Sequence, residues 1–150
     1  MPTNLIISPV LIAGLVSWGI GQTIKVPIEY LRTHSWNWAL LFSAGGMPST
    51  HSSLMSSITL SIGLFDGFNN PLFALAFAVS MIVMYDATGI RRQAGIHAQK
   101  INLLVDALFK GQPISDDVLK EVLGHSPMQV LMGTLLGSTI SLLTWLIFRP

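Results

Sequence analysis

Residues 49–65 read STHSSLMSSITLSIGLF, an uncharged stretch in which six serines and two threonines are interspersed with apolar side chains. Hydroxyl groups and small side chains allow helices to pack closely inside a membrane bundle. We therefore expect this stretch to be a helix buried among other, more apolar helices.

Three further uncharged stretches flank this one, namely residues 1–24, 67–85 and 122–148. A membrane span needs roughly 20 apolar residues to cross ~30 Å of hydrocarbon. Leu5–Ile24 and Met128–Phe148 meet that length, and Leu72–Tyr85 meets it by continuing through Ala87. The predicted fold is all-α: an integral membrane bundle of about four spans, forming a single domain over residues 1–150.

The overall composition agrees with a membrane location. Mean hydropathy is +0.61 and only 10% of residues are charged, which is more apolar than ordinary soluble domains. A net charge of +1 provides no basic surface for a nucleic acid, so none is expected as a partner. Because the chain has no cysteine, any chemistry must use His, Ser, Lys, Arg or carboxylates.

Residues 86–121 differ from the rest because they hold ten of the fifteen charges. Apolar residues recur there at helical spacing, at Ile101, Leu104, Val105 and Leu108. This pattern predicts an interfacial amphipathic helix that lies at the membrane surface or against the bundle. A turn at residues 111–113 should end it, and a short helix should follow up to about Leu123.

Four spans would place residues 25–47 and 86–127 on one face of the membrane, and residues 66–71 with both termini on the other. Seven of the eight Lys and Arg residues fall on the first face. The positive-inside rule then predicts that this face lies in the cytoplasm, with the chain in a bacterial inner membrane. In the last span, Gly133 and Gly137 form a small-residue face for helix packing, with a possible use in a homo-oligomer.

Three polar clusters fall on the predicted cytoplasmic face. The first contains Lys25 and Arg32, which are seven residues apart and therefore lie almost on one helix face, where both could reach one anion. Alternatively, the two are basic anchors whose charged ends reach the lipid headgroups.

The second cluster, residues 45–52, reads GGMPSTHS. A glycine pair followed by Pro48 at the expected first helical position leaves unpaired N–H groups at a helix N-terminus, which suits an anion. Ser49 and His51 would stand at its mouth. The alternative is a capped helix start with a histidine that binds a carbonyl group.

The third cluster covers residues 85–102. Asp86 ends a membrane span, where an ionisable group is costly without a partner, so we expect it to pair with Arg91, Arg92 or His97. The alternative is a charged interfacial loop. Cations, a helix N-terminus and the two histidines His51 and His97 together suit a phosphate group, which carries about −1.5 to −2 charge.

The order of these residues resembles the three signature motifs of the type-2 phosphatidic acid phosphatase and vanadium haloperoxidase superfamily. The motifs are Lys25-x6-Arg32, Pro48-Ser49-Thr50-His51 and Arg91-x5-His97. The stretches GGMPSTHS, MYDATGIRRQAG and LGHSPMQV are similar to the small divergent bacterial and plastid branch of that superfamily.

This resemblance implies a phosphate-binding site made by Lys25, Arg32, Arg91, Ser49 and the backbone amides at Thr50 and His51. His51 would be the general acid and His97 the nucleophile that forms a phosphohistidine, with no metal or other cofactor. The motif's Asp, four residues after the nucleophile, is Ile101 here. Asp86 or Asn102 is therefore a candidate to orient the imidazole.

Two functions follow from these observations. The first is a membrane phosphatase for a lipid phosphate of the phosphatidate, phosphatidylglycerophosphate or polyprenyl phosphate type, acting through a phosphohistidine. The second is a non-catalytic membrane protein that binds anionic lipid or phosphate. The pair of histidines favours the enzyme, whereas the missing Asp favours the binding protein.

Overall fold

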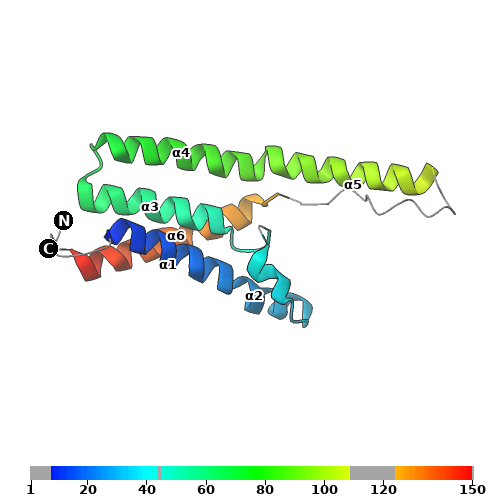
Figure 1. Cartoon of the computed structure of the whole chain (residues 1–150), viewed down its shortest axis with the longest axis horizontal. Coiled ribbons are helices and arrows are strands. Elements are labelled where there is room, and N and C mark those ends of the chain that lie inside the picture. The colour runs from blue at the N-terminus through cyan, green and yellow to red at the C-terminus, as the bar shows by residue number, and fades with distance from the viewer. Residues whose placement is uncertain (1–7, 44, 109–123, 150) are drawn as a thin grey trace.

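The computed structural model describes residues 8–43, 45–108 and 124–149, and all regular structure in them is helical. Its elements are α1 (Pro9–Thr23), α2 (Lys25–Thr33), the short 3-10 helix η1 (Trp38–Phe42), α3 (Thr50–Asp66), α4 (Pro71–Thr88), α5 (Ile90–Leu108) and α6 (Pro127–Phe148) (Figure 1). The prediction of an all-α chain is confirmed for these residues.

Helix α3 lies at the centre of the bundle and packs against α1, α4 and α6. Hydroxyl groups make each of these contacts. The Ser17 hydroxyl of α1 donates to the Ser53 carbonyl at 3.0 Å, and Ser61 bonds to Ser141 of α6 at 2.8 Å. On the remaining side, Thr59 bonds to Ser80 of α4 at 2.7 Å. The prediction that the serine-rich stretch is a buried helix is therefore confirmed.

Helix α6 approaches α3 closely because it presents two glycines to it. A Cβ atom added at Gly133 would overlap the backbone oxygen of Ser49, and one added at Gly137 would overlap that of Ser53. Both glycines are buried inside the chain. They thus serve helix packing within one molecule, as the sequence predicted, and the homo-oligomer contact stays a prediction.

Within the described residues, three helical stretches are long and apolar enough to cross a membrane: Pro9–Thr33, Pro71–Val105 and Pro127–Phe148. Helix α3 is not among them. Its 17 residues give a length of about 25 Å, slightly less than the hydrocarbon thickness. The fold is thus a bundle in which three apolar helices enclose a shorter, more polar one.

The residues that lie opposite one another in these contacts also show in which direction each helix runs. Helix α6 runs parallel to α3, whereas α1 and α4 run antiparallel to it. The start of α1, the end of α6 and the α3–α4 connection lie at one end of the bundle (Figure 1). The starts of α2, α3 and α6 lie at the other end, which is the arrangement predicted from the sequence.

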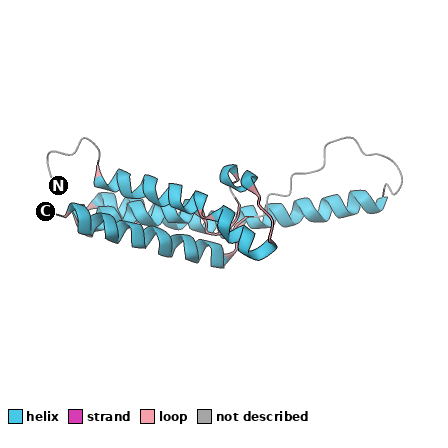
Figure 2. Cartoon of the chain, turned by 90° about the horizontal axis from the view of Figure 1, so that it is seen from below, coloured by secondary structure: helices cyan, strands magenta, loops and turns pink. Residues whose placement is uncertain are grey.

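Helix α5 differs from its prediction. It continues the direction of α4 and projects beyond the bundle, as Figures 1 and 2 both show, and among the described elements it contacts only α4. Helical hydrogen bonding runs through the junction, because Gly89 N–H donates to Tyr85 and Gln93 N–H donates to Gly89. The chain therefore does not turn back, and the expected position against the bundle is wrong, whereas the position at the membrane surface stays a prediction. The short helix expected after residue 113 lies outside the described residues.

Candidate functional site

The N-termini of two parallel helices meet at one end of the bundle. Ser49 caps α3 by accepting a hydrogen bond from Ser52 N–H, and its own N–H donates to the Gln129 carbonyl of α6 at 3.0 Å. Ser126 caps α6 in a capping box with Gln129. Since helix N-termini carry partial positive charge, their convergence favours an anion. Pro48 precedes the cap, so α3 starts at Thr50, two residues later than the sequence suggested.

Lys25 adds a full positive charge at the same end. Gly21, one turn before it on the same helix face, lies against Thr50, because an added Cβ there would be 3.2 Å from Thr50 Cγ2. Lys25 is only 1% exposed, and its Nζ donates to the Ser43 carbonyl at 3.0 Å. Among the described residues this is its single hydrogen bond, so two ammonium hydrogens remain for a ligand.

The glycine pair brings the chain over Lys25. Gly46 has a φ of 91°, a conformation that side chains with a Cβ rarely adopt. A Cβ atom added there would lie 3.4 Å from Lys25 Cδ. The glycine therefore lets the backbone cover the lysine just before Ser49.

A side chain that the sequence analysis did not select fastens this loop. Gln22 Nε2 lies within hydrogen-bonding distance of three carbonyl oxygens, at 3.1 Å from Leu40, 2.6 Å from Leu41 and 3.1 Å from Ser43. In the sequence, Gln22 is distinguished only as an amide side chain near the end of an apolar span. Gln22 and Lys25 together hold the segment that leads to α3.

Replacing Gln22 with leucine should lower the free energy of unfolding by about 1–3 kcal/mol, because the carbonyl groups would lose their donor. Thermal unfolding in detergent measures this change. Thr23→Val is the matched control, since the Thr23 hydroxyl bonds only to carbonyls of its own helix. Equal unfolding temperatures for the two variants would contradict this role of Gln22.

Two histidines meet beside the helix starts. His51 is exposed on the first turn of α3, and its ring centroid lies 6.3 Å from that of His125. His125 is 6% exposed, and its backbone N–H donates to the Ala87 carbonyl at the end of α4. Its Nδ1 is 3.3 Å from Gln129 Oε1. The histidine that the fold brings to His51 is thus His125, which the sequence analysis did not select as a site residue.

The sequence held a signal for His125 that went unused. It lies in LGHSPMQV, a stretch quoted for its family likeness, where polar residues precede a long apolar span. Gln129 follows it by four residues, the separation at which two side chains meet on a helix.

His97 is placed elsewhere. It is exposed on α5, where it lines a shallow hollow with Tyr85 and Gln93. Since α5 contacts only α4 among the described elements, this fold does not bring His97 to His51. Arg91 belongs to the same helix, and its side chain lies outside the described part of the structure.

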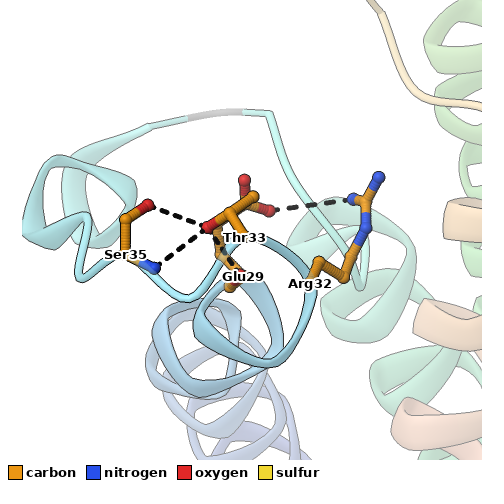
Figure 3. Close-up of polar contacts among 4 residues, drawn as sticks. All are labelled: Glu29, Arg32, Thr33 and Ser35. Carbon is orange, nitrogen blue, oxygen red and sulfur yellow. Dashed lines mark hydrogen bonds and ion pairs between the residues drawn. The ribbon is translucent and has the colours of Figure 1, made fainter.

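Arg32 lies on the surface of α2. Its guanidinium is 3.7 Å from the Glu29 carboxylate (Figure 3), and the side chain is 66% exposed. Beside it, the Thr33 hydroxyl bonds to the Glu29 carbonyl and to Ser35, which ends the helix. Arg32 thus pairs with a neighbour on its own helix, as an interfacial anchor does.

Asp86 is half-buried near the end of α4, one residue before the carbonyl that accepts from His125. Its backbone therefore lies near that of His125 in the folded chain. Its pairing with Arg91, Arg92 or His97 stays a prediction.

The site as assembled contains Lys25, Ser49, the start of α3 at Thr50, His51 and His125. It combines a buried cation, two helix N-termini and two imidazoles. An anion can bind to the first two features, and the imidazoles can transfer protons to or from it, or attack it.

Comparisons with known proteins identify the family of this chain. Residues 6–140 match the sequence profile of the divergent PAP2 family. The chain is 36% identical over 143 residues to YuiD of Bacillus subtilis (strain 168), described as an uncharacterized membrane protein, covering 88% of this chain and 90% of YuiD. No solved structure shows a significant match. This membrane protein therefore belongs to the divergent PAP2 family.

Proposed function

We propose that the protein is a membrane phosphatase that hydrolyses a lipid phosphate through a phosphohistidine intermediate. The observation that carries this proposal is the pairing of His51 with His125, 6.3 Å apart by ring centroids, at the end of the bundle where Lys25 is buried. Binding a phosphate requires cations and amides, whereas paired imidazoles suit its transfer.

The hydrogen bonds of Gln129 indicate which ring nitrogen of His125 carries the proton, and this distinguishes the roles of the two histidines. Its Oε1 accepts from Ser126 N–H at 2.9 Å, so the atom that faces His125 is an acceptor. We therefore assign the proton to His125 Nδ1, which places the lone pair on Nε2. We assign His125 as the nucleophile. His51, exposed at the start of α3, is the general acid.

The reaction then balances in two steps. His125 Nε2 forms a bond to phosphorus as the bond to the lipid oxygen breaks, and His51 gives its proton to that oxygen. Neutral His51 next takes a proton from water, whose oxygen attacks phosphorus and releases His125. Lys25, Ser49 and the amides at the start of α3 stabilise the phosphate oxygens.

The remaining predicted residues keep their proposed roles as alternatives. Arg32 and Arg91 are candidate phosphate ligands, and Asp86 is a candidate orienting group. His97 is the alternative nucleophile implied by the superfamily likeness. The excess of Lys and Arg at this end supports a site that faces the cytoplasm of a bacterial inner membrane.

A binding protein without activity is the second candidate, and one observation favours it. Gln129, which contacts His125 Nδ1, is a neutral amide. An amide orients the imidazole but adds no charge to stabilise its positive form. Such a site could hold anionic lipid or phosphate without turning it over.

Release of phosphate by the purified protein distinguishes the two functions. In detergent with EDTA present, we expect hydrolysis of phosphatidate, phosphatidylglycerophosphate or a polyprenyl phosphate, because no step needs a metal. Binding of these lipids without phosphate release would favour the second function. Activity that disappears with EDTA and returns with Mg²⁺ would contradict the mechanism.

A further inference from the structure

An apolar surface groove of about 240 Å³ lies between the beginning of α2 and helix α6. Its walls are formed by Ile24 and Ile28 on one side, Pro48 at the loop, and Met132, Leu135 and Thr139 on α6. The proposed mechanism uses none of these side chains.

The groove begins where the candidate site ends. Gly46 covers Lys25, the next two residues line the groove, and Ser49 then caps α3. Leu136, which also lines the groove, lies against Gly21 beside Thr50. One short segment therefore forms both the edge of the site and the upper wall of the groove.

The groove also runs in a defined direction. Helix α6 starts at the site and leads away from it toward the end of the bundle where α1 begins. The segment from Met132 to Thr139 extends about 10 Å along this helix. A molecule with its phosphate at the site could thus place its remaining part along α6, within the apolar zone of the bundle.

The lining restricts the chemistry of the occupant. The Thr139 hydroxyl already donates to the Leu135 carbonyl at 2.8 Å, and the other lining side chains are apolar. Leu135 is 53% exposed and Ile24 is 38% exposed, so the groove is open along its length. A polar ligand would find no partner here, whereas a hydrocarbon chain would gain contact with apolar surface.

We propose that this groove holds a hydrocarbon chain of the lipid phosphate whose headgroup occupies the site, an inference that rests on the proposed function. The occupant is then a chain attached to a phosphate, and not bulk membrane lipid. The groove would select substrates by the presence of an apolar chain near the headgroup.

Photo-crosslinking tests the occupant independently of turnover. The probe is a phosphatidate with a diazirine in the glycerol-proximal half of one acyl chain, incorporated with the whole protein into phosphatidylcholine nanodiscs. We expect cross-links concentrated at residues 24–28 and 132–139, and unlabelled phosphatidate should displace them more effectively than added phosphatidylcholine.

A groove-filling variant and its matched control complete the experiment. Leu135→Trp should reduce cross-linking. It should also lower the ratio of kcat/KM for dipalmitoyl phosphatidate to kcat/KM for glycerol 3-phosphate, the chain preference, by about tenfold, because several methylene contacts are lost. Leu146→Trp should leave that preference unchanged, since Leu146 is 51% exposed on the same helix and does not line the groove. Thr139→Phe is a second filling variant with the same expected direction.

The outcomes separate the two proposals. Cross-links spread evenly over the lipid-facing helices, or displaced equally by phosphatidylcholine, would overturn the groove assignment. Equal preferences for Leu135→Trp and Leu146→Trp would overturn it as well. Cross-links confined to the groove without phosphate release from any lipid would instead overturn the proposed hydrolysis and support chain binding.

Discussion

His125→Ala is expected to reduce the rate of lipid-phosphate hydrolysis by about 100- to 10,000-fold or more. That range is the effect of losing a positioned proton-transfer group, and loss of a nucleophile should reduce the rate at least as much. His51→Ala should cause a loss of similar size. The effect should appear in the rate of phosphate release under saturating substrate. Folding should survive, because the backbone bond from His125 to Ala87 does not depend on the imidazole.

His97→Ala is the matched control, because it removes an imidazole that is exposed on α5. We expect it to keep a rate close to that of the parent protein. In addition, rapid acid-free quenching with a radiolabelled substrate should trap phosphate on the peptide that contains His125. If His97→Ala abolished hydrolysis while His125→Ala did not, His97 would be the nucleophile, and α5 would have to fold back over the site.

Gly137→Ala should destabilise the protein by about 3 kcal/mol, at the upper end of the cost of overpacking. The added methyl group would meet the backbone oxygen of Ser53, and α6 could make room only by moving away from α3. This movement would also separate Ser61 from Ser141, whose hydroxyl groups join the same two helices one turn further along α6. Thermal or denaturant-induced unfolding in detergent measures the loss.

The same substitution at Gly19 provides the control. Nothing lies within 4 Å of a Cβ atom built at Gly19, which is also in the middle of a helix. Gly19→Ala should therefore leave stability unchanged or raise it by up to about 1 kcal/mol through higher helix propensity. Similar stabilities for the two alanine variants would show that α6 is not held close to α3.

The burial of the central helix could be predicted because it follows from the chemical type of its side chains. Serines repeated along an uncharged stretch indicated a helix that must be enclosed, and α3 is enclosed. Counting the membrane spans also predicted that Lys25 and Ser49 lie at the same end of the bundle. The path of α5 could not be predicted in this way, since an amphipathic pattern indicates a face but not a direction, and Gly89 continues the helix instead of turning it.

The candidate site was predicted in part for a related reason. Lys25, Ser49 and His51 lie near one another in the folded chain because neighbouring helix ends carry them. His97 was chosen through its spacing from Arg91, and spacing along one helix gives no distance to another helix. His125 was overlooked because it stands in a short connection, although that connection is joined to α4 by a backbone hydrogen bond.

The hydroxyl-rich surface of α3 has a consequence for how the protein is made. Residues such as Ser53, Ser57 and Ser61 are fully enclosed in the finished bundle but would face lipid if α3 entered the membrane alone. Its most extensive partner, α6, follows it in the chain only after α4 and α5. Biogenesis must therefore keep α3 in a protected environment until α6 has been synthesised and can pack against it.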